Sequence, residues 1–316
     1  MKILITGAAG FIGSHTAEAL LKKRITIIGI DDLNNYYDPK IKKNNLATLN
    51  KYNNFTFYKA DIRNKKTLET IFKKHKIDKV IHLAARAGVR PSIKDPQLYK
   101  DVNITGTMNL LDLAVKHKVK QFVFASSSSV YGKNKKIPFS ETDIVDCPIS
   151  PYAATKKAGE LICYTYHHLH KLPVVCLRFF TVYGPRGRPD MTPYLFTKLI
   201  SEGKTIERYG DDNVKRDFTY ITDIVDGIVA SLKIKKGYEI INLGNNNPVK
   251  LSYFISLIEK NIGKKAKIIR KPLPSGDVPI TYADIRKASK ILGYKPKVRI
   301  EEGIKKMVEW YLKENA

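Results

Sequence analysis

The sequence predicts an α/β protein that consists of a doubly wound parallel sheet and a smaller C-terminal α/β domain. Short apolar runs, typical of buried strands, occur at residues 2–6, 26–30, 55–58, 79–83, 121–125 and 174–179. Helical patterns such as 66–74 and 103–115 lie between them, and strands that alternate with helices in this way form a parallel sheet. A glycine-rich segment also follows the first run directly, as in doubly wound nucleotide-binding sheets.

The pattern changes near residue 180. Helical stretches are then separated by loops, and Pro and Gly are frequent around 184–189 and 271–279. The helical stretches lie at 191–201, 251–262 and 300–313. We therefore expect a first domain over residues 1–180, to which a segment near 215–245 returns, and a second domain over 181–316 that closes over the first.

Composition excludes several classes of protein. No apolar run approaches the roughly 20 residues that span a bilayer, and the first apolar stretch is too short for a secretion signal. The three cysteines (Cys147, Cys163 and Cys176) have no CxxC spacing, which excludes a disulfide scaffold and a zinc ribbon. We expect a cytoplasmic protein with no metal site and no membrane partner.

The chain is strongly basic, with 56 Lys+Arg against 30 Asp+Glu and a formal net charge of +26. The lysines are scattered in short clusters, and no basic tail or RNA-binding aromatic signature accompanies them. Most of this charge is interpreted as a solvated face, with attraction of anionic substrates or incidental polyanion binding as alternatives. No specific nucleic-acid partner is expected.

Gly7, Gly10 and Gly13 stand between a predicted strand and a predicted helix. In a dinucleotide-binding loop the first glycine permits a tight turn, the second lets the backbone approach a pyrophosphate and the third lets helix and strand pack closely. Asp31 lies 18 positions after Gly13, where a carboxylate accepts hydrogen bonds from the adenosine ribose and repels a 2′-phosphate. The sequence favours NAD over NADP, with an ordinary glycine turn and a helix-capping Asp as the alternatives.

Tyr152 and Lys156 form a YxxxK pair at the start of a predicted helix, so both side chains face the same way. An ammonium group near a phenol favours the phenolate, and such a tyrosine can accept a hydroxyl proton while hydride leaves the same carbon. Four serines, residues 126–129, follow a predicted strand whose carboxyl end would face the same crevice. Their hydroxyls are candidates to hold the reacting oxygen, and the residues leave open which serine does so.

Together, the glycine loop, Asp31, the HLAA segment at 82–85, the SSSSVYG segment at 126–132 and the YAATK segment at 152–156 resemble the extended short-chain dehydrogenase/reductases, and more narrowly their NAD-dependent nucleotide-sugar epimerases. The resemblance covers nearly the whole chain. It implies a Rossmann-type sheet, with the NAD-binding domain at 1–180 and a domain at 181–316 that mainly binds the nucleotide sugar. It also implies a homodimer that pairs through the helix at 103–115 and the helix that begins with YAATK.

The resemblance also implies roles for individual residues. Tyr152 would be the catalytic base, Lys156 its electrostatic partner and nicotinamide-ribose ligand, and Ser127 the catalytic serine, with Ser128 and Ser129 near the substrate. The residues expected to bind NAD are Gly7, Gly10, Phe11, Ile12, Gly13, Asp31, Asp32, Asp61, Ile62, Leu83, Ala84, Ala85, Tyr152 and Lys156. The residues expected to bind the substrate are Arg90, Ser127, Ser128, Thr181, Arg188, Arg216 and Asp277.

The residues beside Ser127 suggest the reaction. Related dehydratases have an Asp-Glu pair there and related decarboxylases a Glu, whereas this chain has serines, so the resemblance implies 4-epimerisation. In that mechanism tightly bound NAD takes hydride from C4 and returns it to the opposite face of a 4-keto sugar, so the cofactor is regenerated in each turnover.

The segment at 178–191 resembles the corresponding segment of UDP-glucuronate 4-epimerases, with Thr181 in place of the Asn usual in UDP-glucose epimerases. Arg188 would then meet the C6 carboxylate of the sugar, and a surface or diphosphate-binding arginine is the alternative. Arg90 is a second candidate anion ligand, Arg216 would contact the diphosphate and Asp277 the uridine ribose. The favoured reaction interconverts UDP-glucuronate and UDP-galacturonate. A UDP-glucose or UDP-N-acetylglucosamine 4-epimerase and a non-catalytic scaffold that binds NAD or polyanions are the alternatives.

Overall fold

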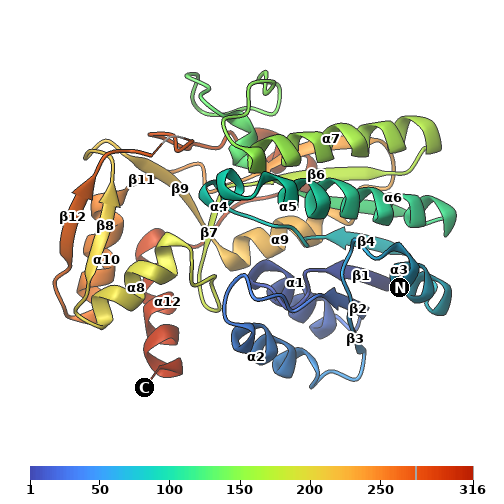
Figure 1. Ribbon diagram of the computed structural model, residues 1–316, viewed down its shortest axis with the longest axis horizontal. Coiled ribbons are helices and arrows are strands. Elements are labelled where there is room, and N and C mark those ends of the chain that lie inside the picture. The colour runs from blue at the N-terminus through green and yellow to red at the C-terminus, as the bar shows by residue number, and fades with distance from the viewer. Residues whose placement is uncertain (275, 316) are drawn as a thin grey trace.

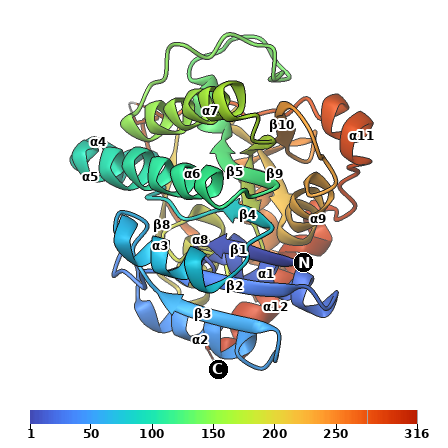
Figure 2. The same ribbon diagram turned by 90° about the vertical axis from the view of Figure 1, so that its right-hand side faces the viewer.

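The computed structural model describes residues 1–274 and 276–315, and its largest element is a seven-stranded parallel sheet (Figures 1 and 2). The strand order is β10-β6-β5-β4-β1-β2-β3, and every neighbouring pair is parallel. Its strands are β1 (Lys2–Thr6), β2 (Thr26–Asp31), β3 (Phe55–Lys59), β4 (Lys79–His82), β5 (Gln121–Ser127), β6 (Val174–Phe179) and β10 (Tyr238–Leu243). The predicted doubly wound parallel sheet is confirmed.

Helices cover both faces of this sheet (Figure 2). One face packs against α1 (Phe11–Lys22), α2 (Pro39–Leu49), α9 (Ile221–Ser231) and α11 (Arg286–Leu292). The other face packs against α3 (Lys65–Lys74), α6 (Gly106–Lys116) and α7 (Pro151–His170). The short helices α4 (Val89–Lys94) and α5 (Pro96–Lys100) precede a π-helical turn at Asp101–Thr105, and a 3₁₀ turn spans Ser128–Tyr131.

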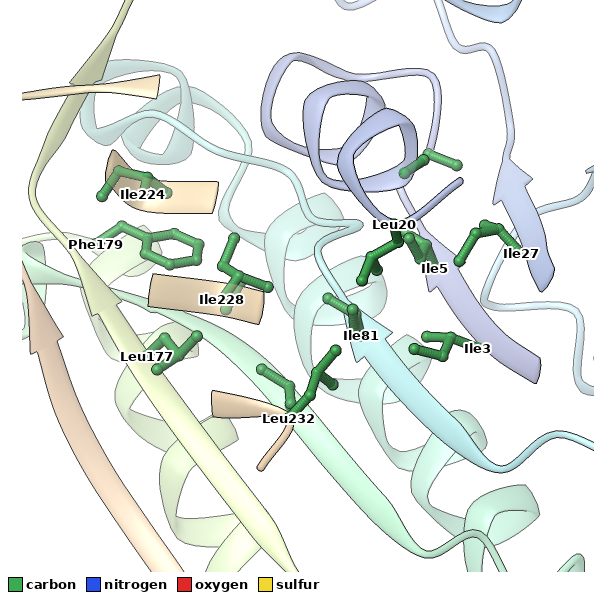
Figure 3. Close-up of a cluster of buried hydrophobic side chains, with 14 of the residues drawn as sticks. Ile3, Ile5, Leu20, Ile27, Ile81, Leu177, Phe179, Ile224, Ile228 and Leu232 are labelled. Atoms are coloured by element: carbon green, nitrogen blue, oxygen red, sulfur yellow. The ribbon is translucent and has the colours of Figure 1, made fainter. Parts of the chain in front are cut away.

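Side-chain alternation along the strands builds the two halves of the core. In β1, Ile3 and Ile5 point to one face and Leu4 points to the other, as expected for a strand that is buried on both sides. Figure 3 shows the first of these halves, in which Ile3 and Ile5 lie near Leu20 of α1 and Ile81 of β4. This packing holds the carboxyl ends of β1, β2, β4 and β5 at one edge of the sheet, where the candidate residues follow.

A second region lies beside this edge and has its own core (Figure 1). It contains a three-stranded sheet in the order β11-β9-β7 and a parallel pair, β12 with β8. The strands are β7 (Thr181–Tyr183), β8 (Thr205–Tyr209), β9 (Lys215–Tyr220), β11 (Pro248–Lys250) and β12 (Lys267–Lys271). The helices are α8 (Thr192–Ser201), α10 (Leu251–Ile262) and α12 (Ile300–Glu314).

The sequence predicted an α/β domain for the second region and located its helices, but it did not locate the strands. Its strands are three to six residues long, and all five residues of β12 are exposed, so they give no apolar run. Within the segment 215–245, α9 and β10 lie against or within the large sheet, whereas β9 belongs to the three-stranded sheet.

Candidate active site

A cleft of about 1070 Å³ lies between the carboxyl edge of the large sheet and the second region. All the residues predicted from the sequence to bind NAD or substrate, or to act in catalysis, line this cleft. They come from both regions: from the carboxyl ends of β2 and β5, from the loops after β1, β2, β3 and β4, and from the start of α1. The others come from the turn after β5, from α4 and α7, and from β7, β9 and the segments around 188 and 277. The fold therefore brings residues that are up to 270 positions apart to one place.

The glycine loop makes a turn that side chains would block. Gly7 has φ +70°, and a Cβ added to Gly13 would lie 2.0 Å from the carbonyl oxygen of Gly7. Gly10 immediately precedes α1 and has no side chain to occupy the first amides of that helix. Free amides at a helix N-terminus attract phosphate, so this loop fits a dinucleotide such as NAD.

Asp31 lies at the end of β2 and is almost fully buried. Its carboxylate accepts hydrogen bonds from the backbone N–H of Ala9 (3.2 Å) and of Leu33 (2.9 Å). Burial raises the pKa of Asp31, and the buried ammonium group of Lys42, 3.6 Å away, opposes that change. A carboxylate has about four lone-pair positions, so two remain for ribose hydroxyls.

Asp32 and Asp61 already have partners for their side chains. Asp32 accepts hydrogen bonds from the backbone N–H (3.1 Å) and the side-chain amide (2.5 Å) of Asn34. Asp61 forms an ion pair with Arg63, in which Nη2 and Oδ2 are 2.6 Å apart. Both carboxylates line the cleft at the end where the adenosine is expected.

Tyr152 and Lys156 lie in the first turns of α7. The helix begins after Ser150, whose hydroxyl accepts a hydrogen bond from the N–H of Ala153 (3.1 Å), and Pro151 occupies the first helical position. The Lys156 ammonium donates to the carbonyl oxygen of Ala125 (2.7 Å) and lies 6.0 Å from the centroid of the Tyr152 ring. Burial lowers the pKa of Lys156 to about 8, so it is largely protonated at pH 7.

The structure distinguishes among the four serines. Ser126 is buried and donates to the carboxylate of Glu160 (2.6 Å), so its hydroxyl is already used. Ser127 donates to the hydroxyl of Ser129 (3.1 Å) and lies close enough to Tyr152 to affect its titration. Burial raises the pKa of Tyr152, while the Ser127 hydroxyl and the Arg188 guanidinium act in the opposite direction. Ser127 is therefore the one of the four serines whose hydroxyl acts on the pKa of Tyr152.

Arg188 lies in the segment after β7, near the tyrosine. Its Nε and Nη2 form a two-pronged ion pair with Asp190, at 3.0 and 2.5 Å. Nη2 is also 3.5 Å from the carbonyl oxygen of Ala87, and the guanidinium carbon lies 5.3 Å from the centroid of the Tyr36 ring. Thr181, the first residue of β7, lines the same cleft.

The remaining predicted substrate residues lie at the nucleotide end. Arg90 and Asp277 pair with each other (3.0 Å), and the Arg90 guanidinium carbon lies 4.1 Å from the centroid of the Tyr209 ring. Arg216 donates to the carbonyl oxygens of Lys215 (2.9 Å) and Pro279 (3.0 Å), and burial lowers its pKa. Arg90 and Arg216 therefore both contact the segment 277–279.

Tyr36, Lys42 and Tyr209 are among the cleft residues that sequence reasoning missed. No local signal identifies them, because Lys42 is one of many lysines in a polar helix and the two tyrosines lie in unremarkable polar segments.

Within residues 1–274 and 276–315, no group of three or more His, Cys, Asp or Glu side chains could hold a metal ion. In the same residues, no helix is long and apolar enough to cross a membrane.

Comparison with known proteins extends these observations. Residues 4–307 match the family described as GDP-mannose 4,6 dehydratase. The chain is 51% identical over 308 residues to a UDP-glucuronate 4-epimerase of Thermodesulfobacterium geofontis, covering 97% of this chain and 95% of the other. It is 45% identical over 330 residues to UDP-glucuronate 4-epimerase 1 of Arabidopsis thaliana, covering 99% and 77%.

Solved structures agree with the sequence matches. The UDP-glucuronic acid 4-epimerase of Bacillus cereus, in complex with UDP-glucuronic acid and NAD, has a TM-score of 0.94 and 40% identity and covers 99% of this chain and 100% of the other. A UDP-glucose 4-epimerase of Thermotoga maritima with UDP-glucose has a TM-score of 0.92 and 33% identity, with both chains covered completely. The chain therefore belongs to the GDP-mannose 4,6-dehydratase family, within the extended short-chain dehydrogenase/reductases.

Proposed function

We propose that this protein is an NAD-dependent isomerase that interconverts UDP-glucuronate and UDP-galacturonate by epimerisation at C4. The observation that carries the proposal is the joint position of Ser127, Tyr152 and Arg188 in one cleft, with a glycine loop that fits a dinucleotide at its other end. Relatives at 45–51% identity named UDP-glucuronate 4-epimerase support the same reaction.

The residues around the glycine loop would hold NAD. Gly7, Gly10 and Gly13 let the backbone approach the pyrophosphate, Asp31 accepts from the adenosine ribose, and Lys156 donates to the nicotinamide ribose. When bound, NAD supplies a hydride acceptor and donor for the carbon that is epimerised. Residues 1–180 would form most of this site, and residues 181–316 most of the nucleotide-sugar site.

Tyr152 and Ser127 would carry out the transfer of the proton from the O4 hydroxyl of the sugar. The Ser127 hydroxyl holds the O4 hydroxyl of the sugar against Tyr152, which accepts its proton as the carbonyl forms and returns it when the carbonyl is reduced. The Ser127 hydroxyl and the Arg188 guanidinium lower the pKa of Tyr152 against the effect of burial. We expect the Lys156 ammonium, 6.0 Å from the centroid of the Tyr152 ring, to favour the phenolate as well. Position 128 and position 129 are serines, so no carboxylate stands next to Ser127 in the chain to drive elimination of water.

Arg188 would bind the C6 carboxylate. The 4-keto form of a hexuronate is a β-keto acid, which loses carbon dioxide when its carboxylate bond aligns with the carbonyl π system. Charge-assisted hydrogen bonds from a guanidinium fix the carboxylate and can prevent that alignment. At the other end of the cleft, Arg216 would contact the diphosphate, Asp277 the uridine ribose, and Arg90 an anionic group of the nucleotide.

A UDP-glucose 4-epimerase is the second candidate. It is supported by the TM-score of 0.92 to the Thermotoga maritima enzyme. The ion pair between Arg188 and Asp190 also supports it, because the Asp190 carboxylate neutralises the charge of Arg188 when the sugar has no carboxylate.

The proposal includes a homodimer that forms through α6 and α7. Large apolar side chains are exposed on these helices, among them Met108, Leu161, Tyr164 and Leu169, with exposed fractions of 42–70%. The two helices pack side by side (Figure 2), so these side chains form a surface that a second copy can bury. Sedimentation at micromolar concentration should show a dimer, and a monomer would contradict this part of the proposal.

The reaction is tested by incubating the purified protein separately with UDP-glucuronate, UDP-glucose and UDP-N-acetylglucosamine, without added NAD. Chromatography should show UDP-galacturonate from the first substrate at the highest rate. Conversion of the neutral sugars alone would support the second candidate, and no conversion even with added NAD would contradict the assignment as an epimerase.

A further inference from the structure

The side chain of Tyr36 lies where three loops of the cleft meet. Tyr36 itself belongs to the loop between β2 and α2. Its hydroxyl donates a 2.8 Å hydrogen bond to the carbonyl oxygen of Ala87, in the loop after β4. Arg188, from the segment after β7, places its guanidinium over the Tyr36 ring at 5.3 Å from the centroid. One half-buried tyrosine therefore connects segments near positions 36, 87 and 188.

The carbonyl oxygen of Ala87 is a second link between Tyr36 and Arg188. It accepts hydrogen bonds from the hydroxyls of Tyr36 (2.8 Å) and Tyr99 (3.0 Å), and Nη2 of Arg188 approaches it at 3.5 Å. Two hydroxyls thus fix the position of an oxygen that the guanidinium also contacts. Removing Tyr36 would take away one of these hydroxyls and the ring beneath the guanidinium at the same time.

The contacts of Arg188 also determine which of its hydrogens can meet a ligand. Asp190 binds Nε and one hydrogen of Nη2, and the carbonyl oxygen of Ala87 takes the other hydrogen of Nη2. Among the contacts that residues 1–274 and 276–315 make, the two hydrogens of Nη1 remain for an anionic group. The edge of the guanidinium is bound by Asp190 and its face packs against the Tyr36 ring, so its rotation is restricted. The N–H groups of Nη1 therefore keep a fixed orientation.

We propose that Tyr36 is a positioning residue for Arg188, and that through Arg188 it sets the preference of the cleft for a sugar nucleotide with a carboxylate at C6. This inference rests on the proposed function. Tyr36 supports the guanidinium with its ring and fixes the Ala87 carbonyl with its hydroxyl. Without the ring, Arg188 would still pair with Asp190 but could rotate about that pair, so the substrate carboxylate would be bound less often in the right orientation.

The ring of Tyr36 also lies near Arg86, whose guanidinium carbon is 5.6 Å from the centroid. Arg86 donates a long hydrogen bond (3.4 Å) to Asn34, which in turn accepts from the N–H of Tyr36. A test must therefore separate an effect through Arg188 from an effect through Arg86. A double-mutant cycle of Tyr36 with Arg188 makes this separation, because residues that act through one another give non-additive changes.

The experiment measures binding by calorimetry in protein that carries Tyr152→Phe, so that no turnover disturbs the titration. The ligands are UDP-glucuronate and UDP-glucose. The variants added to this parent are Tyr36→Leu, Tyr36→Phe, Arg188→Met, the pair Tyr36→Leu with Arg188→Met, and the control Tyr253→Leu. Tyr253 is an exposed tyrosine on α10 outside the cleft, so its substitution should change neither affinity. Tyr36→Met replaces Tyr36→Leu if the latter fails to fold.

We expect Tyr36→Leu to weaken UDP-glucuronate binding about tenfold, and UDP-glucose binding less than twofold. Tyr36→Phe keeps the ring and should retain most of the affinity. In the Arg188→Met background, Tyr36→Leu should cause no further loss.

Three results would overturn the inference. Equal weakening of both ligands by Tyr36→Leu would show a general effect on the cleft. An undiminished loss in the Arg188→Met background would assign the effect to Arg86 or another group. Equal affinity of the parent for the two ligands would contradict the proposed preference for a hexuronate, and the inference with it, whereas the first two results would overturn the inference alone.

Discussion

The ammonium group of Lys156 donates a 2.7 Å hydrogen bond to the carbonyl oxygen of Ala125. Lys156 belongs to α7, and Ala125 lies near the end of β5, just before the four serines. The bond ties the helix that carries Tyr152 to the strand that carries Ser127. The same lysine is buried, and its ammonium lies 6.0 Å from the centroid of the Tyr152 ring, where the proposed function uses it to favour the phenolate.

Replacement of Tyr152 by Phe should abolish turnover while the fold and bound NAD are kept. The substitution removes the hydroxyl that accepts the proton, and loss of a general base costs typically 10²–10⁴-fold in rate. Initial rates, the NAD content of the purified protein and its melting temperature measure the three quantities. Tyr253→Phe is the control, since Tyr253 lies outside the cleft. A variant with more than about a tenth of the original rate would assign proton transfer to another group.

Replacement of Arg188 by Met should reduce kcat/KM for UDP-glucuronate about 10- to 100-fold, and for UDP-glucose much less. A hydrogen bond to a charged group contributes about 1.5–3 kcal/mol, which corresponds to that range. A carboxylate that is no longer held should also lose carbon dioxide from the keto form. Release of carbon dioxide per epimerisation event is therefore expected to rise. Equal losses for the two substrates would speak against Arg188 as the carboxylate ligand.

Breaking the ion pair between Arg90 and Asp277 should weaken binding of the UDP-sugar and leave the free energy of unfolding almost unchanged. Their side chains are 47% and 23% exposed, and exposed ion pairs contribute about 0–1 kcal/mol. If Asp277 accepts from the ribose, Asp277→Asn should raise KM for the UDP-sugar while the free energy of unfolding changes by less than about 1 kcal/mol. Urea unfolding and steady-state kinetics measure both. A large loss of stability with unchanged KM would show that the ion pair stabilises the fold and does not bind the substrate.

Buried His82 should make the protein less stable in acid. Burial, with a smaller effect from Lys156, lowers the pKa of His82 from 6.5 to about 3. Between pH 6.5 and pH 3 the unfolded chain binds a proton that the folded chain does not, so the free energy of unfolding falls by about 1.4 kcal/mol for each unit of pH lost. Above pH 6.5 the contribution is complete.

The variant His82→Gln should remove that part of the slope, because Gln does not titrate. It can still hydrogen-bond to Thr6 and Thr107, the partners of His82. His168→Gln is the matched control, since His168 is exposed on α7. Urea unfolding from pH 7 to pH 5 measures the slopes, and equal slopes for the two variants would disprove the role of His82.

Most of the large sheet could be predicted from the sequence, because its strands are buried on both faces and therefore appear as apolar runs. Loops at the carboxyl ends of such strands must lie together, which is why the positions of Asp31, Ser127 and Tyr152 in one cleft were predictable. The second region was harder to predict. Its short strands, such as β12, are exposed and polar, and they are held by pairing with distant partners rather than by an apolar pattern.

Contacts between distant segments were not predictable. The sequence identified Arg90 and Asp277 separately as ligands, and nothing local indicates that they pair. The contact of Lys42 with Asp31 was not predictable either, because only the fold places the two side chains 3.6 Å apart. Tyr36 is polar-flanked and half-buried, and its contact with Arg188 depends on the mutual position of three loops. The periodicity of a single sequence does not indicate which distant segments come into contact.

In the proposed reaction hydride leaves C4 and returns to C4 within one cleft, and an isotope experiment can follow that hydride. UDP-glucuronate labelled with deuterium at C4 is incubated with the purified protein in ordinary water, and the product is analysed by mass spectrometry and NMR. Deuterium retained at C4 of UDP-galacturonate is the predicted result. Loss of the label to water, or a product inverted at C5, would rule out transient oxidation and reduction at C4.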